Sequence, residues 1–430
     1  MTPLHRARRR STLVLLGLFG ALTLLPASGL AQSPSPEPDV ETPPPTPVVG
    51  PGGQISPSPF PTTLQTPSAA TATPSIDAGS AVLADLDSGR VLFASDPDER
   101  RPIASVTKVM TALVVLERAD PDDVVTVSEE AAGPRVAGIS GLGLQVGERI
   151  RVRELLYALL LQSANDAAEA LAEHVSGSVE AFVDLMNTRG VGLGLTRTRF
   201  DSPNGLDDEG YSTARDLVRL TRAAYEVPGF ADLVATRFHT VHSPTAGPRI
   251  VQNRNALLWL YPGAIGVKTG FTTPAGFCLV AAAERDGERL VAVVLGEPGE
   301  PFSDAATLLN HGFAAFERRT LLERGAPLGT VEVAGRDVAV SAGGSVAALV
   351  AIGAGVERTI VLEDRVAYPP RLGEVIGGVR LSAAGRRVGL VPLVVSGVPP
   401  PPPPDAGSWW GRALGAVAEA ADAVLDGLLG

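Results

Sequence analysis

The feature that most constrains the fold of this chain is a pair of strand-turn-strand patterns separated by a long, mainly helical stretch. Residues 78–96 carry two alternating apolar runs around an Asp-Ser-Gly turn, and residues 275–296 carry two more around an Arg-Asp-Gly turn. A two-stranded hairpin is only marginally stable by itself in water. We therefore expect the distant segments to complete one sheet, which predicts an α+β sandwich whose antiparallel sheet is flanked by helices.

The stretch between the two hairpins shows the periodicity of buried helices. Apolar residues recur at helical spacing over 105–119, 152–162 and 165–175, and Pro121 ends the first of these runs. Another helix is predicted over 302–318, after the second hairpin. The helices supply the apolar faces that are needed to cover such a sheet.

Composition divides the rest of the chain. Residues 1–31 combine four arginines, an apolar run and small residues before Gln32, which is typical of a secretory signal and predicts a protein outside the cytoplasm. The run is too short and wrongly flanked for a good membrane span, but an uncleaved anchor stays open as an alternative. The predicted segments are a signal peptide (1–31), a Pro/Ser/Thr-rich disordered linker (32–76), the α+β domain (77–320), a small all-β domain (321–397), a Pro-rich linker (398–406) and an amphipathic helix (407–430).

The terminal helix carries Trp409 and Trp410 at its start and an acidic polar face. Tryptophan at the head of an amphipathic helix suits a membrane interface, whereas an acidic face gives no attraction to anionic lipid. Peripheral membrane contact, packing on the protein and self-association all fit this pattern.

Residue counts exclude several classes of partner and cofactor. Without the four arginines of the signal, 32 basic residues face 47 acidic ones, and such a chain repels nucleic acid. A single cysteine, Cys278, allows no intrachain disulfide. The histidines lack zinc-type spacing, and the Gly-rich run at 138–147 has no P-loop lysine, so the sequence predicts neither a metal site nor a nucleotide cofactor. A small molecule or a wall polymer is the expected partner.

Lysine is scarce, since only Lys108 and Lys268 stand among 36 Lys and Arg residues. Lys108 follows Ser105 by three positions, so at the start of a helix the amine and the hydroxyl lie on one face. A buried lysine beside a second cation can be neutral and accept the serine proton, whereas arginine keeps its proton in proteins. The residues after Lys108 are apolar on all sides, which favours a buried helix. Ser105 is therefore a candidate nucleophile with Lys108 as its base.

A second group of polar residues lies at the break between two apolar helices, in the sequence Ser163-Ala164-Asn165. A buried break must satisfy its own polar groups, and these side chains can instead point into a cleft. Ser163 would then relay a proton and Asn165 would meet a substrate amide. The alternative is that both residues cap the following helix.

A third group is Lys268-Thr269-Gly270, at the entry to the second hairpin. Glycine in a strand lets the backbone approach a ligand closely, so the Phe271 N–H is a candidate oxyanion donor. Lys268 and Thr269 are candidate ligands of a carboxylate, and the charge of Lys268 would lower the pKa of Lys108.

Together and in this order, the three groups resemble the S-x-x-K, S-x-N and K-T-G boxes of penicillin-recognising serine enzymes. Over about residues 77–320 the chain resembles the D-alanyl-D-alanine carboxypeptidases among the low-molecular-mass penicillin-binding proteins, for example in SAVLADLDSGRVLFASDPDERRPIASVTKVMTAL and FDSPNGLDDEGYSTARDL. The resemblance implies a β-lactamase/transpeptidase-like sandwich with a helical subdomain, followed by a small β-rich domain. It also makes 77–320 the catalytic domain.

The resemblance implies an exported serine D-Ala-D-Ala carboxypeptidase that acts on peptidoglycan stem peptides and is acylated by β-lactams. Ser105 would be the acylated nucleophile, Lys108 the general base, Ser163 the relay to the departing D-alanine and Asn165 a substrate amide contact. Ala164 departs from the Gly or Asp that is frequent at this position and leaves the flanking side chains in place.

The resemblance also implies roles for the third group. Lys268 and Thr269 would bind the terminal carboxylate, and Gly270 would let the strand approach the substrate. The backbone N–H groups of Ser105 and Phe271 would form the oxyanion hole.

Two other functions stay open at this point. A class A β-lactamase has the same boxes but needs a Glu-x-x-Leu-Asn loop, where this chain has RTRFDSPNGLD, with Asp201 as the remaining carboxylate and no Glu until Glu209. A non-catalytic peptidoglycan-binding protein would keep the cleft as a recognition site, although the intact boxes argue against it.

Overall fold

The computed structural model describes residues 73–133, 139–206, 209–398 and 409–429. The predicted signal peptide lies outside these residues, as do residues 32–72 of the first predicted linker and 399–406 of the second.

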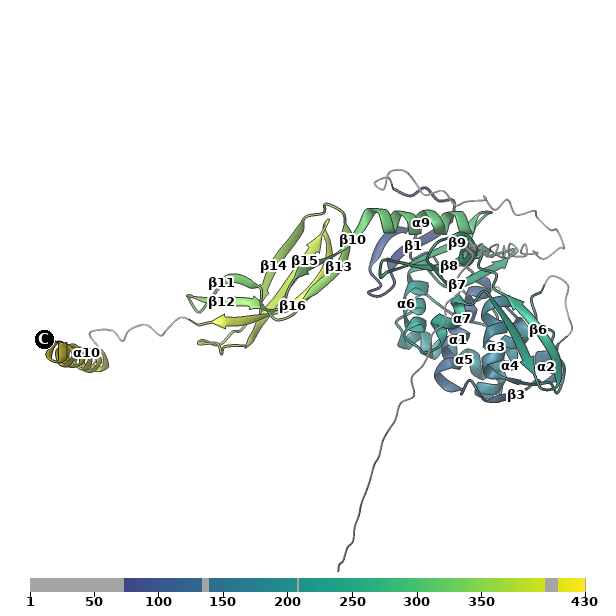
Figure 1. Ribbon diagram of the computed structural model, residues 1–430, viewed down its shortest axis with the longest axis horizontal. Helices are drawn as coiled ribbons and strands as arrows, with labels where there is room; N and C mark the ends of the chain where they lie inside the picture. The colour runs from purple at the N-terminus through teal and green to yellow at the C-terminus, as the bar shows by residue number, and fades with distance from the viewer. Residues whose placement is uncertain (1–72, 134–138, 207–208, 399–408, 430) are drawn as a thin grey trace, which may run out of the picture. The chain divides into compact units, whose positions relative to one another are not determined.

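The two hairpins do form one sheet, as expected (Figure 1). It is antiparallel, with the strand order β2-β1-β9-β8-β7. Ser80 at the start of β1 pairs with Leu295 near the end of β9, and Asp85 at the end of β1 pairs with Leu290. The first hairpin thus joins the second through the whole length of β1. The bounds are β1 Ser80–Asp85, β2 Val91–Ser95, β7 Ala264–Thr272, β8 Gly276–Arg285 and β9 Glu288–Glu297.

Both faces of this sheet are buried, because side chains alternate between two apolar clusters. Val82 and Val293 pack into a large cluster with the helical segment, whereas Leu83 and Val294 pack with the helix after β9. The central strands β1, β8 and β9 therefore read as nearly continuous apolar runs. Burying each large aliphatic side chain contributes roughly 1.5–3 kcal/mol.

α9, together with Leu257 of the short helix α8, covers one face of the sheet, and most of the helical segment covers the other (Figure 1). α1 begins at Lys108, directly after a 3-10 turn (η1), and a π-helical turn (η2) follows α3. The bounds are η1 Ala104–Thr107, α1 Lys108–Arg118, α2 Glu129–Ala132, α3 Val152–Tyr157, η2 Ala158–Gln162, α4 Asn165–Ser176, α5 Val179–Gly192, α6 Ala214–Tyr225, α7 Phe230–Ala235, α8 Leu257–Leu260 and α9 Pro301–Ala315.

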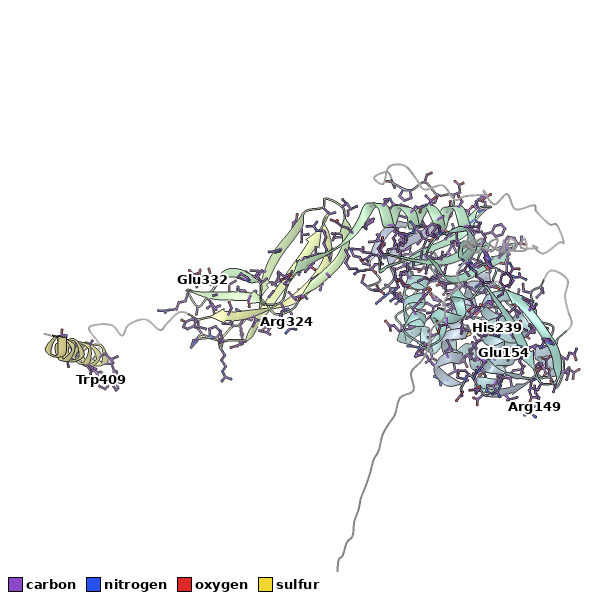
Figure 2. The ribbon with its side chains drawn as sticks, in the orientation of Figure 1. Arg149, Glu154, His239, Arg324, Glu332 and Trp409 are labelled. Atoms are coloured by element: carbon purple, nitrogen blue, oxygen red, sulfur yellow. The ribbon has the colours of Figure 1, made fainter. Side chains whose placement is uncertain are left out.

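Two short antiparallel pairs border the helical segment: β3 (Val124–Thr126) with β4 (Arg149–Arg151), and β5 (Phe238–Ser243) with β6 (Ala246–Gln252). His239 of β5 lies 3.0 Å from Glu154 of α3 and stacks on Tyr157 with ring centroids 3.7 Å apart (Figure 2). His239 and His242 of β5 are thus part of a structural contact between a hairpin and a helix, because the His242 N–H also donates to Glu154, at 3.0 Å.

A second, all-β unit follows α9. β10 (Phe316–Leu322) pairs with β13 (Val346–Ala351), and the other strands form a five-stranded antiparallel sheet in the order β11-β12-β16-β15-β14. Their bounds are β11 Pro327–Val333, β12 Arg336–Ala342, β14 Val356–Leu362, β15 Val375–Ala383 and β16 Arg386–Gly397. An apolar cluster of its own, which includes Val338, Val379 and Leu393, supports this unit.

The predicted C-terminal end of the helix over 302–318 was wrong. α9 stops at Ala315, and Phe316 already has extended backbone angles, φ −126° and ψ 148°. Phe316 pairs with Ala351 and Glu317 with Val350, so strand pairing with a distant segment overrides the local helical pattern.

The predicted amphipathic helix is present as α10 (Trp409–Leu429). Trp409 and Trp410 are exposed and their rings lie 3.7 Å apart. Among the helices that the structure describes, α10 included, none has the length and apolar character needed to span a bilayer.

Candidate active site

Ser105 lies on η1, the tight turn that leads into α1 and partly exposes its side chain. The residue before it, Ala104, has a φ of 46°, in the left-handed region that residues other than glycine and asparagine rarely adopt. Such a conformation persists only where neighbouring segments hold it. Two glycines allow those segments to come close. At Gly205 a Cβ would lie 2.0 Å from the Ala104 carbonyl oxygen, and at Gly270 2.9 Å from the Ile103 carbonyl oxygen.

Lys108 is completely buried, and its ammonium group is held by three acceptors. Nζ lies 2.9 Å from Ser105 Oγ, 2.6 Å from Asn165 Oδ1 and 2.6 Å from the Asn204 carbonyl oxygen. The sequence placed the amine within reach of the hydroxyl, and the structure shows that contact. The other two acceptors come from segments distant in sequence.

The pKa of Lys108 lies well below the ordinary lysine value. Burial is the main cause, because it disfavours the charged amine, and the positive charges of Lys268 and Arg254 lower the pKa further. Glu169 and Asp166 act in the opposite direction. The neutral form of an amine 2.9 Å from a hydroxyl can accept its proton.

The second predicted group lies where η2 ends and α4 begins. Ser163 closes η2 in a left-handed conformation, φ 65° and ψ 34°, and is buried. Asn165 is the first residue of α4, and its Oδ1 accepts from Lys108. In the described part of the chain, Ser163 makes no hydrogen bond to Ser105 or Lys108. The cap hydrogen bond that the alternative interpretation required is absent at the N-terminus of α4.

Lys268 lies on the edge strand β7 and is 1% exposed. Its Nζ donates to the Thr269 carbonyl at 2.9 Å, and Thr269 itself is half-buried. Burial, together with the charge of Arg254, lowers the pKa of Lys268 to about 7. The two scarce lysines thus share one buried site, and the charge of Lys268 depresses the pKa of Lys108.

Gly270 lets β7 lie directly against the nucleophile turn. A Cβ at this position would come within 3.1 Å of both the Ser105 and the Val106 backbone nitrogens. The next residue, Phe271, packs on Phe277 of β8 with ring centroids 4.6 Å apart. The backbone of β7 at Gly270 is therefore adjacent to the Ser105 backbone nitrogen.

We expect Gly270→Ala to lower kcat/KM at least about 10-fold and to destabilise the fold by about 1–3 kcal/mol, because the added methyl pushes β7 away from the Ser105 turn. Activity assays and urea unfolding measure the two effects. Gly247→Ala on β6 is the matched control, since nothing lies within 4 Å of its Cβ. Wild-type kinetics in Gly270→Ala would show that the close approach is not needed.

Sequence reasoning missed three residues of this site: Asn204, Glu169 and Arg254. The Asn204 carbonyl accepts from Lys108, while its side-chain Nδ2 donates to Glu169 Oε1 at 2.9 Å. Arg254 contributes charge that lowers the pKa of both lysines. The available signals were the Asn-Gly turn at 204–205 and the polar run at 253–255, but neither carries a recognisable spacing to the boxes.

The fold and the partly exposed serine in contact with a buried lysine define a class of serine peptidases and penicillin-recognising enzymes. A model of the peptidase S11 family, D-alanyl-D-alanine carboxypeptidase, matches residues 67–299, just over half of the chain. The protein belongs to this family.

Individual relatives agree with this assignment. The chain is 35% identical over 344 residues to the D-alanyl-D-alanine carboxypeptidase DacC of Escherichia coli (strain K12), covering 75% of this chain and 84% of the relative. It is 42% identical over 241 residues to the DacB2 enzyme of Mycobacterium tuberculosis, covering 54% and 81%. Penicillin binding protein 5 from Haemophilus influenzae has a similar structure, with a TM-score of 0.65 at 32% identity, covering 76% of this chain and 98% of that one. The predicted sandwich with a β-rich domain is thus confirmed.

Proposed function

We propose that this protein is a serine D-Ala-D-Ala carboxypeptidase that removes the terminal D-alanine from peptidoglycan stem peptides through an acyl-enzyme on Ser105. The family assignment supports the activity, and the contact between Lys108 Nζ and Ser105 Oγ carries the mechanism. Removal of the terminal residue would limit cross-linking by depriving transpeptidases of their donor.

In the acylation step, neutral Lys108 takes the proton of Ser105 as Oγ attacks the carbonyl carbon of the penultimate D-alanine. The N–H groups of Ser105 and Phe271 stabilise the negative charge that develops on the carbonyl oxygen. The C–N bond then breaks as the proton held by Lys108 passes through Ser163 to the nitrogen of the departing D-alanine, which returns Lys108 to its neutral form. An ester between Ser105 and the shortened peptide remains.

In the deacylation step, water attacks this ester and Lys108 accepts its proton. The C–O bond to Ser105 breaks, Oγ takes that proton from Lys108, and the shortened peptide leaves with a new carboxylate. A β-lactam acylates Ser105 in the same way, but the amine it releases stays tethered to the acyl group after ring opening.

Two further interactions position the substrate. Lys268 and Thr269 bind the terminal carboxylate, and the nearby charge of Arg254 strengthens the attraction. Because Asn165 Oδ1 faces Lys108, its Nδ2 is the group that meets the carbonyl of a substrate amide.

Release of D-alanine from a defined pentapeptide, compared with a cross-linked dimer, tests the proposed function. Stoichiometric release from the pentapeptide supports it, and absence of release contradicts it. Penicillin turnover in the same preparation tests the class A β-lactamase alternative. Slow, near-stoichiometric acylation fits a carboxypeptidase, whereas rapid hydrolysis of penicillin fits a β-lactamase and contradicts the proposal. Covalent retention of a labelled penicillin on Ser105 excludes the alternative of a non-catalytic peptidoglycan-binding protein.

We place the enzyme outside the cytoplasm, where its peptidoglycan substrate lies. The basic and apolar pattern of 1–31 supports export. The exposed tryptophans at the start of α10 make a peripheral membrane contact part of this proposal. The catalytic domain, 77–320, supplies the chemistry, and the β-rich domain over 321–397 serves as a spacer or wall-contact module.

The buried Lys268 predicts that stability rises with pH. Its pKa is about 7 in the folded protein against an ordinary 10.5, so above about pH 7 the unfolded chain binds more protons than the folded one. Between pH 6 and pH 8 this single group adds about 1.4 kcal/mol to the free energy of unfolding.

Urea unfolding at the two pH values measures this contribution, with Lys268→Met as the comparison. The pH 8 minus pH 6 difference is expected to be smaller by about 1.4 kcal/mol in the variant, because methionine does not titrate. Equal differences in both proteins would show that Lys268 keeps an ordinary pKa.

A further inference from the structure

A pocket of about 570 Å³ lies between the β1–β2 hairpin and the all-β unit, and its volume is in the range of small-molecule sites. Its lining contains four arginines and neither aspartate nor glutamate. Arg90 follows the β1 turn, Arg215 lies in the first turn of α6, and Arg386 and Arg387 begin β16. The chain as a whole has a net charge of −11, whereas the charged residues that line this pocket are all positive.

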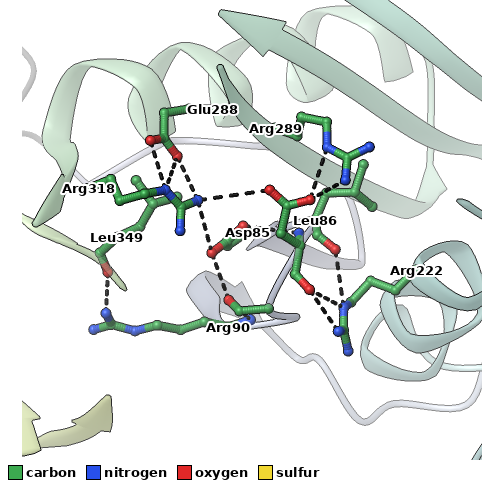
Figure 3. A network of polar contacts seen from close by, with 10 residues as sticks. Asp85, Leu86, Arg90, Arg222, Glu288, Arg289, Arg318 and Leu349 are labelled. Atoms are coloured by element: carbon green, nitrogen blue, oxygen red, sulfur yellow. Dashed lines mark hydrogen bonds and ion pairs between the residues drawn. The ribbon is translucent and has the colours of Figure 1, made fainter. Parts of the chain in front are cut away.

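The carboxylates near the pocket already have partners (Figure 3). Asp85 and Glu288 face Arg318, at 3.5 and 2.7 Å, while Asp87 pairs with Arg289. The carboxylate of Asp98 forms two hydrogen bonds with Arg215, at 2.8 and 3.1 Å.

The remaining guanidinium groups lack such partners. Arg90 donates to the main-chain carbonyl of Leu349, a neutral acceptor (Figure 3). Burial lowers the pKa of Arg90, and the charge of Arg386 lowers it further although Asp85 opposes both effects. Within the described ranges, neither Arg386 nor Arg387 forms an ion pair. Both side chains are exposed and line the pocket.

We propose that this pocket binds a phosphate-bearing ligand. Arginine binds oxyanions through paired N–H donors, and a phosphate carries up to two charges where a carboxylate carries one, so it matches this density of cations better. The volume leaves room for the group that bears the phosphate.

The site is separate from the active site. It adjoins β2, whereas Lys268 and Phe271 lie on β7, and these two strands are the opposite edges of the sheet. Four strand spacings separate them, on the order of 19 Å. The inference therefore does not rest on the proposed peptidase activity.

Calorimetric titration of the chain without the predicted signal peptide, residues 32–430, with inorganic phosphate at low ionic strength tests the proposal. We expect saturable binding of one phosphate that weakens at least 10-fold in the double variant Arg386→Glu, Arg387→Glu. The matched control is Arg371→Glu, Arg380→Glu, which makes the same charge change at two exposed arginines of the all-β unit outside the lining. Release of D-alanine from a short peptide should be unchanged in both variants, which also shows that they fold.

Absence of saturable phosphate binding, or an equal loss in the control, would overturn the proposal, because only general charge attraction would then remain. Sedimentation with phosphatidylglycerol vesicles distinguishes the sources of the phosphate. Parallel loss of vesicle binding in the pocket variant identifies a lipid headgroup, whereas loss of phosphate binding alone identifies a soluble ligand.

Discussion

Ser105→Ala is expected to abolish both release of D-alanine and covalent labelling by penicillin, with a loss of kcat/KM of at least about 10³-fold. The hydroxyl is the atom that forms the ester, and Lys108 Nζ lies 2.9 Å from it. Alanine removes that atom while Lys108 keeps its contacts with Asn165 and Asn204. Mass spectrometry of penicillin-treated protein and an assay of released D-alanine measure the two effects.

Ser396→Ala serves as the control for this experiment, since Ser396 is exposed on β16 of the all-β unit. It should retain wild-type labelling and peptide cleavage. A Ser105→Ala enzyme that still acquires one covalent penicillin would place the nucleophile elsewhere.

Lys108→Arg should be nearly as damaging, with kcat reduced by about 10²–10⁴-fold, because arginine keeps the charge and does not accept a proton from serine. The completely buried position also has to take up a larger, permanently charged group. Lys108→Met separates these effects: it removes the amine with little change in volume, and we expect it to be folded and equally inactive. Steady-state kinetics and circular dichroism distinguish the two variants.

The same substitution at the other lysine is the matched comparison. Lys268→Arg retains a cation for the substrate carboxylate, so its main effect should be a higher KM with a smaller loss of kcat. A Lys108→Arg enzyme with near-wild-type kcat would contradict the assignment of Lys108 as the base.

Much of the site could be predicted from the sequence because its chemistry is encoded at short range. Ser105 and Lys108 are one helical turn apart, so their proximity follows from the local conformation alone. The two hairpins followed from alternating apolar residues around glycine turns, and their pairing followed from the instability of an isolated hairpin. The order of the three boxes then pointed to the family that the comparisons confirm.

Other features were beyond local reasoning. Asn165 and Asn204 reach Lys108 from 57 and 96 residues away, and no periodicity links them to it. The end of α9 at Ala315 depends on a strand partner at Ala351.

The sequence by itself determined which groups the protein can use: a serine with a lysine one turn later, a second lysine on a strand, and hairpins that must share a sheet. Only the tertiary structure decided the electrostatics, because a pKa depends on burial and on charges brought together from distant segments. The low pKa of Lys108 thus arises first from the burial of its amine and then from packing that brings the charges of Lys268 and Arg254 near it. The gathering of four arginines around one pocket has the same origin, since they come from three segments far apart along the chain: the β1–β2 turn, α6 and β16.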